Sequence, residues 1–473
     1  MVNKFKKILI ANRGEISIRI ARACKELGIR SIAIYSEEDK NSLFRTKADE
    51  SYLIGEGKTP IGAYLAIDEI IEMAKAKGAD AIHPGYGFLS ENVEFAKACE
   101  DAGIVFIGPD YKMMGQLGDK IQSKLVAQEV GVPTIPGVEE AIPSEKAAKE
   151  FAEKCGYPVM LKAAAGGGGR GMRIVHSEEE LIPSFRSALS EAKKAFGIDD
   201  IFIEKYLESP KHIEVQILGD NYGNLVHLYE KDCSIQRRHQ KVVEFTPALC
   251  LDDAKRKAIC EDALKIAKFV SYRSAGTVEF LLDKHGNHYF IEMNPRIQVE
   301  HTVTEMTTGI DIVHAQIMIA SGCKLGDDEI GIKSQEDVKP IGAAIQCRIT
   351  TEDPANDFAP DTGTINLYRS ASGFGIRLDG GNGFTGAVIS PYYDSLLVKI
   401  TSYARTFEEA SKKSLRALSE TKIKGVKTNM AFLANVLNHE KFKEGDCDTG
   451  FIAENPELLN MIEIGRASCR ERV

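Results

Sequence analysis

Short apolar runs alternate with amphipathic segments through roughly the first 115 residues of the chain. One segment, residues 16–27, has helical spacing of its apolar positions. The runs with the length and composition of buried strands are residues 7–11, 31–35, 79–82 and 104–107. Such alternation predicts an open parallel α/β sheet. The first turn, residues 12–15, has one glycine and lacks the GxGxxG of dinucleotide-binding folds.

The pattern changes after residue 115, where a helical segment at 120–129 precedes the sequence GVPTIPGV. Residues 138–205 hold a glycine cluster between strand-like runs, and their Gly- and Pro-rich flanks suit a hinged lid. Further strands are expected at residues 213–219, 225–229, 276–282 and 289–292, followed by a helix at 310–320. The remainder, from residue 340 to about 450, is expected to form strands and a helix at 407–418.

With 473 residues the chain is too long for a single hydrophobic core. We expect an N-terminal α/β domain at 1–115, a second domain at 116–335 that includes the lid, and a C-terminal domain at 340–450. The last ten residues, 464–473, change composition abruptly, and we interpret them as an appended cloning remnant outside the fold.

Two strand-like runs flank the turn cluster at residues 283–287 and predict a β-hairpin. If the turn lies at the middle of this cluster, Glu279 and Glu292 face each other, about 5 Å apart at Cβ. Two such carboxylates repel unless a cation lies between them, and together with the amide of Asn294 they suit Mg²⁺ or Mn²⁺. An exposed hairpin with merely solubilising acids is the alternative, but the neighbouring positions are apolar.

Strand-like runs also flank a glycine-rich loop. Its consecutive glycines are Gly166, Gly167, Gly168 and Gly169. Backbone N–H groups of such a loop can converge on an anion without interference from Cβ atoms. No Gly-Lys-Ser/Thr follows, and a strand begins at Met172, so the pattern predicts a phosphate-binding hairpin rather than a Walker loop. Polyglycine is more often a flexible linker, but Lys162 and Arg170 bracket this one.

Composition narrows the class of protein. The chain is 43% hydrophobic and 27% charged with a net charge of -9, so we expect a globular protein that binds no nucleic acid. No apolar run reaches the length of a membrane span, so no membrane association is expected. The ten cysteines lie scattered without a CxxC pair, which argues against zinc and disulfide frameworks and favours the cytoplasm.

Longer strings narrow the function. In chain order they are ILIANRGEISIRI, HPGYGFLSEN, GDK, KAAAGGGGRGM, KHIEVQILGD, RRHQKVVE, MNPRIQVEHTVTE and YYDSLLVKI. Lys162 with the glycine loop, Glu279, and the Glu292-x-Asn294-x-Arg296 pattern resemble the ATP-grasp superfamily. All the strings together resemble biotin carboxylase from about Lys6 to Phe451. The string LDGGNGFTGAVISPYYDSLLVKI is more similar to the biotin carboxylases of pyruvate carboxylation than to the acetyl-CoA carboxylase subunit.

The resemblance implies an α/β fold with an N-terminal open parallel sheet, an ATP-grasp domain with a mobile glycine-loop lid, and a C-terminal α+β domain. It implies carboxylation of biotin by bicarbonate through carboxyphosphate, with Mg²⁺ as cofactor and ATP as substrate. The sequence has no Met-Lys-Met attachment motif and no carboxyltransferase region. Biotin is therefore expected on a carrier domain or chain elsewhere, with a carboxyltransferase as a further partner. A homodimer is expected, and Arg19 and Glu26 are candidates for its interface.

The resemblance also assigns site residues. Glu300 would remove the bicarbonate proton, Arg296 would bind bicarbonate through its planar fork, and Arg348 would stabilise the biotin oxyanion. The other implied residues are Lys241 in catalysis; Lys120, Lys162, Gly166 to Gly169, Met172, Glu204, Lys205, Leu207 and His212 at the nucleotide; Gln236 and His239 at the nucleotide or the biotin wall; and Gln298, Val299, Tyr86 and Asp394 around bicarbonate and biotin. In a strand, Arg296, Gln298 and Glu300 would share one face.

Three other functions remain to be weighed. A synthetase that makes carbamoyl phosphate would carry two copies of the ATP-grasp unit, and this chain has one. A nucleotide-sensing module would be expected to lack Glu300, Arg296 or Arg348, and all are present. A free-standing biotin carboxylase subunit of acetyl-CoA carboxylase is the alternative within the same class.

Overall fold

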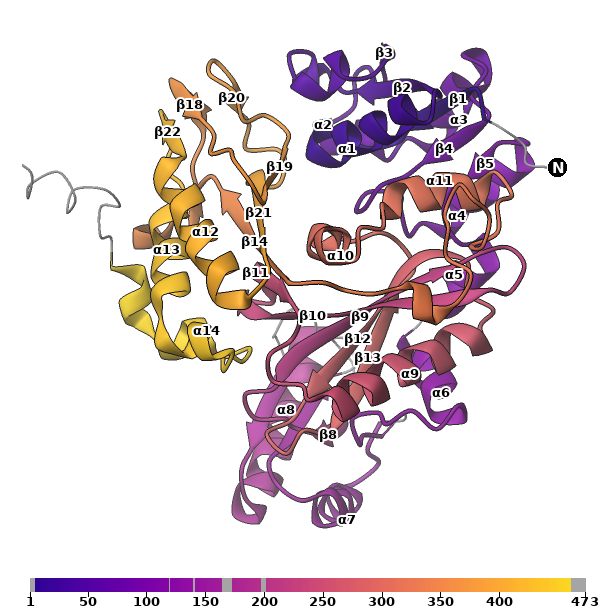
Figure 1. The fold of residues 1–473 in the computed structure, drawn as a ribbon. Coiled ribbons are helices and arrows are strands. Elements are labelled where there is room, and N and C mark those ends of the chain that lie inside the picture. Colours follow the sequence, from indigo (N-terminus) through magenta and orange to yellow (C-terminus); the bar gives the residue numbers. More distant parts are fainter. Residues whose placement is uncertain (1–4, 119, 139–140, 164–171, 197–200, 461–473) are drawn as a thin grey trace, which may run out of the picture.

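A computed structural model describes residues 5–118, 120–138, 141–163, 172–196 and 201–460 of the chain. The chain forms an N-terminal sheet, a long central sheet, a lid and a C-terminal helical layer (Figure 1). The predicted α/β class is confirmed by the N-terminal parallel sheet and the antiparallel sheet that follows it. Among the described residues, no helix is both long and apolar enough to cross a bilayer.

The N-terminal sheet has five parallel strands in the order β3-β2-β1-β4-β5. Its strands are β1 (Lys7–Ile10), β2 (Arg30–Tyr35), β3 (Glu50–Leu53), β4 (Ala81–His83) and β5 (Val105–Phe106). Its helices are α1 (Gly14–Glu26), η1 (Glu37–Asp39), η2 (Leu43–Thr46), α2 (Pro60–Tyr64), α3 (Ile67–Ala76) and α4 (Val93–Asp101). The turns after β1 and β4 meet at the carboxyl edge of the sheet, where open α/β sheets place their sites. The side chain of Asn12 joins the two turns by donating to the carbonyls of Pro84 and Tyr86.

The lid is a three-stranded antiparallel sheet in the order β7-β6-β8, covered by two helices. Its elements are α7 (Glu145–Cys155), β6 (Val159–Ala163), β7 (Met172–Val175), α8 (Glu178–Phe196) and β8 (Ile201–Lys205). It has its own hydrophobic core, which includes Val159, Leu161 and Phe185. The pairing of Lys162 with Met172 confirms the predicted hairpin, while the four glycines between them lie outside the described residues.

The central sheet has eight antiparallel strands in the order β13-β12-β9-β10-β11-β14-β21-β19. Its strands are β9 (Lys211–Gly219), β10 (Leu225–Arg237), β11 (Gln240–Thr246), β12 (Ser274–Leu282), β13 (His288–Asn294), β14 (Ala343–Thr350), β19 (Ile376–Gly380) and β21 (Leu396–Ala404). The contact between β11 and β14 joins two parts of the chain that the sequence pattern placed in separate domains. One sheet therefore carries residues of both parts into the same region.

Helices cover the central sheet and the C-terminal region (Figure 1). They are α5 (Tyr111–Gly118), α6 (Lys120–Glu129), α9 (Asp253–Phe269), α10 (His301–Thr308), α11 (Ile312–Ala320), η3 (Gln335–Asp337), η4 (Pro354–Asn356), α12 (Phe407–Glu420), α13 (Met430–Asn438), α14 (Glu440–Glu444), α15 (Phe451–Glu454) and η5 (Pro456–Leu459). Short strands complete the C-terminal region: β15 (Glu352–Asp353), β16 (Ala359–Pro360), β17 (Gly363–Thr364), β18 (Leu367–Arg369), β20 (Val388–Ile389) and β22 (Lys422–Lys424). Phe245, Ile345 and Ile400, from neighbouring central strands, form one core with α12 and α13.

The hairpin of β12 and β13 has the predicted register, with Glu279 opposite Glu292. A bulge directly after Glu279 shifts the pairs nearer the turn by one residue. The chain does not continue as a strand after Asn294, so the prediction that Arg296, Gln298 and Glu300 share one strand face is wrong. Pro295 has no N–H to donate to a ladder. The chain turns there instead, and Glu300 becomes the N-cap residue of α10.

Three histidines are held in the folded protein in their neutral form. Burial lowers the pKa of His83 and of His301 to about 3 and the pKa of His227 to about 4. In the unfolded chain a histidine has a pKa near 6.5. The unfolded state therefore binds more protons below that pH, so the stabilisation is complete above pH 6.5 and is lost as pH falls toward these lowered values.

We expect the free energy of unfolding, measured by urea titration, to fall between pH 6.5 and 4.5 by up to about 1.4 kcal/mol per pH unit for each of these histidines. His212, whose pKa is raised, does not contribute in this window. His83 Nδ1 accepts from the N–H of Gly85, a contact that an asparagine oxygen can replace. His83→Asn should lower the pH dependence of the free energy of unfolding by the contribution of about one proton. An unchanged pH dependence would show that His83 is not buried in its neutral form.

Candidate functional site

A pocket of about 1540 Å³ lies where the N-terminal sheet, the lid, the central sheet and the C-terminal region meet. Pockets for a single drug-sized ligand are usually smaller than this, so it can hold more than one small molecule. The predicted site residues that line it are Tyr86, Lys162, Glu204, Lys205, Leu207, His212, Gln236, His239, Lys241, Glu279, Glu292, Asn294, Arg296, Gln298, Val299, Glu300, Arg348 and Asp394. The glycines at 166–169 and the side chains of Lys120 and Met172 lie outside the described part of the chain.

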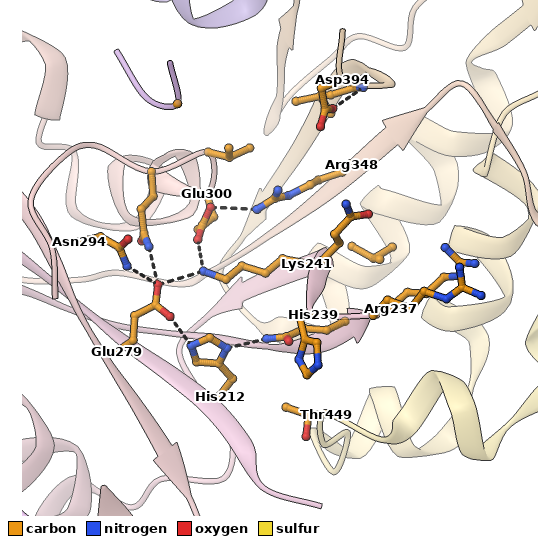
Figure 2. Close-up of a pocket in the computed structure, with 18 of the residues that line it drawn as sticks. His212, Arg237, His239, Lys241, Glu279, Asn294, Glu300, Arg348, Asp394 and Thr449 are labelled. Carbon is orange, nitrogen blue, oxygen red and sulfur yellow. Dashed lines mark hydrogen bonds and ion pairs between the residues drawn. The ribbon is translucent and has the colours of Figure 1, made fainter. Parts of the chain in front are cut away.

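Lys241, at the start of β11, is the central cation of the pocket (Figure 2). Its ammonium group lies 2.7 Å from Glu300 Oε1 and 3.4 Å from Glu279 Oε1, and it also bonds Glu214. Burial lowers the pKa of Lys241, but the three carboxylates outweigh it and raise the pKa well above the ordinary value. The lysine is therefore charged at neutral pH and holds three acids together.

Glu279, on β12, is bound from several directions. Asn294 and Gln298 donate to its Oε1 at 2.7 and 2.8 Å, and His212 lies 2.8 Å from its Oε2. The other ring nitrogen of His212 is 2.5 Å from Gln236 Nε2, so the amide fixes the ring. Burial raises the pKa of Glu279, but Lys241 and His212 lower it far below its ordinary value. Glu279 is ionised throughout the physiological range.

The expected metal set of Glu279, Glu292 and Asn294 meets at one end of the hairpin and lines the pocket. A cross-strand pair of carboxylates is chemistry that suits Mg²⁺, as predicted. The amide of Asn294, however, turns its nitrogen toward Glu279 and accepts at its oxygen from Arg296 Nη2 at 3.0 Å. To ligate a metal through oxygen, this amide would have to rotate. The role of the three residues as ligands stays a prediction.

Glu300 lies between two cations. Its Oε1 faces Lys241, and its Oε2 is 2.9 Å from Arg348 Nη2 on β14. Burial raises the pKa of Glu300, but Lys241 and Arg348 lower it to about 2. The guanidinium of Arg348 is fixed in turn by Glu244, which accepts from its Nε at 2.5 Å. These contacts join β11, β14 and the start of α10.

Arg296 follows Pro295 in the turn between β13 and α10, which spans residues 295–300. Its Nε donates to Glu91 Oε2 at 2.8 Å, so a loop of the N-terminal sheet holds the guanidinium at the pocket. Gln298 Oε1 accepts from Lys231 Nζ at 2.9 Å. The side chains expected to bind bicarbonate thus reach the pocket through a turn rather than along a strand.

The walls of the pocket come from distant segments. On the lid, Lys162 pairs with Glu204, and Lys205 Nζ donates to the carbonyls of Gly156 and Tyr157 at 3.0 and 2.8 Å. The Lys205 ammonium therefore also fixes the lid backbone.

The opposite wall comes from the N-terminal sheet and the C-terminal region. Tyr86 donates its hydroxyl proton to Glu15, and Asp394 precedes β21 and accepts from the N–H of Leu396 at 2.8 Å. His239 lies in the β10–β11 turn with φ of 64°. Side chains from these regions and from the β10–β11 turn therefore all line the same pocket as Arg348.

Sequence reasoning missed several charged residues that support the site, among them Glu91, Glu214, Lys231 and Glu244. Glu214, Lys231 and Glu244 are all 1% exposed or less. Each lies within a strand that is otherwise mostly buried, and an ionisable residue in such a run is a signal that could have identified them. Glu91 lies in a loop and carries no such signal.

Family models place this site in a known class. The model for the N-terminal domain of biotin carboxylase matches residues 4–114, and that for the C-terminal domain matches residues 346–454. Between them, residues 119–328 match the ATP-binding domain of the carbamoyl-phosphate synthase L chain. The chain belongs to the biotin carboxylase family, and the predicted resemblance is confirmed.

Within the biotin carboxylase family, the chain is similar to proteins of pyruvate carboxylation. The chain is 56% identical to the pyruvate carboxylase of Bacillus subtilis (strain 168) over 455 residues, which are 96% of this chain and 40% of that protein. A crystal structure of the biotin carboxylase subunit of pyruvate carboxylase is 50% identical, with a TM-score of 0.87, over 97% of this chain and 100% of that one.

A third relative was solved with ligands. The biotin carboxylase domain dimer of the Hydrogenobacter thermophilus 2-oxoglutarate carboxylase, in complex with MgADP and bicarbonate, has a TM-score of 0.87 and 49% identity. The match covers 97% of this chain and 99% of that one. The chain spans about 40% of the length of the curated pyruvate carboxylases that it matches.

Proposed function

We propose that this chain carboxylates biotin with bicarbonate at the expense of ATP, and that it supplies carboxybiotin for pyruvate carboxylation. One observation carries the proposal. Glu300 lies between Lys241 and Arg348, beside the Glu279–Glu292 pair, in a pocket large enough for a nucleotide and a second substrate. The membership of the chain in the biotin carboxylase family supports the same function.

Glu279 and Glu292 would hold Mg²⁺, which supplies charge neutralisation for the phosphates of ATP. Lysine side chains of the chain would neutralise the same negative charge of the phosphates. Lys241 lies among three carboxylates, and a transferred phosphoryl group offers it a further anionic partner. The lid brings Lys162 to the pocket, and the glycines at 166–169, which lie outside the described residues, would contact the phosphates of the nucleotide.

Glu300 would accept the bicarbonate proton while Arg296 and Gln298 hold the anion. Its carboxylate is ionised above about pH 2, so it can accept a proton at any physiological pH. Lys241 and Arg348 lower the pKa of Glu300. If either cation pairs with a substrate anion instead, the pKa of Glu300 rises and its carboxylate becomes a stronger base. Bicarbonate then attacks the γ-phosphate of ATP, and carboxyphosphate and ADP form.

Arg348 would stabilise the oxyanion of biotin after the ureido nitrogen loses its proton. Its side chain is largely buried and is held by Glu244, so it is oriented before substrate binds. Tyr86, Asp394 and His239 would line the biotin side of the pocket. Carboxyphosphate would break into CO₂ and phosphate, the phosphate would accept the proton of the ureido nitrogen, and that nitrogen would then attack CO₂ to form carboxybiotin.

The proposed partners are a biotin carrier domain and a carboxyltransferase, as part of the same protein or as separate chains. The acceptor is selected at the carboxyltransferase, so the 56% identity to a pyruvate carboxylase is what supports pyruvate. A homodimer is proposed as well, because a related domain was solved as a dimer. Arg19 and Glu26 lie on α1 beside a second cavity, where Arg19 pairs with Glu305 and Asp311.

Phosphate release from MgATP tests the function. We expect release to require bicarbonate, to rise when free biotin is added, and to stop when EDTA removes Mg²⁺ and resume when the metal is restored. Biotin-stimulated turnover excludes carbamoyl phosphate synthesis, for which ammonia would stimulate instead. Binding of ATP without bicarbonate-dependent release would contradict catalysis and indicate a nucleotide-sensing module.

A further inference from the structure

Among the residues that the structure describes, two lysines are completely buried. Lys231 on β10 and Lys399 on β21 are both 0% exposed. Burial of an ammonium group costs several kcal/mol unless a carboxylate pairs with it. Each lysine has such a partner: Lys231 Nζ lies 2.9 Å from Glu214 Oε2, and Lys399 Nζ lies 2.9 Å from Glu15 Oε1. Because a buried ion pair seldom adds net stability over apolar residues of similar volume, stability alone does not explain them.

Both lysines make their other contact with the same turn. Lys231 Nζ donates to Gln298 Oε1 at 2.9 Å, and Lys399 Nζ donates to the carbonyl of Val299 at 2.9 Å. In the central sheet β10 and β21 are separated by β11 and β14, so the lysines reach the turn from two separate strands. The turn itself belongs to neither a strand nor a helix, and side chains must supply part of its support.

Lys231 determines which way the amide of Gln298 points. An ammonium group can only donate, so it binds the amide oxygen and leaves the amide nitrogen on the other side. That nitrogen donates to Glu279 Oε1 at 2.8 Å. Rotation of the amide by a half turn would place two donors, the Gln298 nitrogen and the Lys231 ammonium, against each other. Lys231 therefore sets the donor side of Gln298 toward the pocket.

Lys399 determines the plane of the peptide between Val299 and Glu300. With the carbonyl fixed toward Lys399, the N–H of Glu300 points the opposite way, because the peptide is planar and trans. This also fixes the Cα from which the Glu300 carboxylate reaches Lys241 and Arg348. The same lysine is joined through Glu15 to the hydroxyl of Tyr86 on the biotin side of the pocket.

We infer that Lys231 and Lys399 are positioning residues that preset the turn of Gln298, Val299 and Glu300 to bind a small planar anion, bicarbonate under the proposed function on which this inference rests. Both are fully buried and act through the turn rather than by contact with the substrate. Their loss should weaken the bicarbonate site while the nucleotide side of the pocket, on the lid, stays intact.

Lys231→Met and Lys399→Met test the inference, because methionine keeps the unbranched stem and removes the charge and the donors. Phosphate release is measured against bicarbonate at saturating MgATP, and against MgATP at saturating bicarbonate. We expect the KM for bicarbonate to rise about tenfold or more in each variant, while the KM for MgATP changes by less than about twofold. Arg256→Met is the matched control, because Arg256 pairs with the buried Glu230 and neither residue lines the pocket, so it should change neither KM.

Several outcomes would overturn the inference. A variant that loses turnover with an unchanged KM for bicarbonate, or one in which both KM values rise equally, would show that the lysines only stabilise the fold. If a methionine variant does not fold by circular dichroism, Lys231→Gln and Lys399→Gln are measured, and an unchanged bicarbonate KM in those variants counts equally against it. If the unsubstituted protein shows no bicarbonate-dependent turnover, the proposed function fails and this inference fails with it.

Discussion

Glu300→Gln is expected to lower bicarbonate-dependent phosphate release by about 10²- to 10⁴-fold, the usual contribution of a general base. Glutamine keeps the size of the side chain, and its single amide oxygen can accept from one of the two cations, Lys241 or Arg348, but it cannot take a proton at physiological pH. Release is measured under saturating MgATP and bicarbonate, so that a weaker affinity for either substrate does not account for the loss.

The matched control for this variant is Glu230→Gln. Glu230 is also a buried carboxylate, 1% exposed, and it pairs with Arg256 outside the pocket. We expect the control to lose stability, seen as a lower Tm, with turnover per folded molecule within about twofold of the unsubstituted protein. Equal turnover in Glu300→Gln and the control would show that Glu300 is not the base.

Arg348→Gln is expected to lower biotin-stimulated turnover by about 10²- to 10³-fold, as the loss of an oxyanion-stabilising donor does in other enzymes. The slower bicarbonate-dependent cleavage of ATP without biotin should persist, because Arg348 acts on the biotin side of the pocket. The two rates are measured in the same assay with and without free biotin. Equal loss of both would assign Arg348 to the bicarbonate step instead.

Stability must be followed in the same variant. Burial raises the pKa of Glu244 while Arg348 lowers it, and removal of the arginine leaves this buried carboxylate with Gln346 as a neutral donor. Loss of one partner of a buried ion pair costs about 3 to 5 kcal/mol. Arg348→Lys keeps a positive charge near Glu244 but lacks the planar guanidinium. We expect this variant to recover more of the stability than of the biotin-stimulated turnover, which separates the structural effect of Arg348 from its catalytic effect.

The local pattern of the sequence determined several parts of this structure. The alternation of strands and helices identified the N-terminal parallel sheet, and the register of Glu279 opposite Glu292 followed from strand periodicity and a short turn. The two strands around the glycine loop were found in the same way. These features depend on side chains within about ten to twenty residues of one another, where the hydrophobic pattern and the turn residues act directly.

Residue strings that resemble a known family identified most of the residues of the pocket. The spacing of those residues along the chain, however, gave a wrong prediction of the backbone that carries them. The expected strand of Arg296, Gln298 and Glu300 ends at Asn294, because Pro295 cannot continue the ladder. The motif thus identified the right residues, while the turn and the start of α10 place them. A sequence motif identifies residues without any knowledge of their backbone conformation. The wrong prediction of a strand therefore did not change which residues were assigned to the site.

Only the tertiary structure decided which charges meet. Arg348 lies on β14 and reaches Glu300 because β14 pairs with β11, a contact between segments about a hundred residues apart. The burial of Lys231 and Lys399 beneath one turn likewise depends on the order of strands in the central sheet. The sequence alone determined the local elements and the residue types of the site, since periodicity is a property of neighbouring residues. The fold decided their pairing, because contacts between distant strands are selected by the packing of the whole sheet.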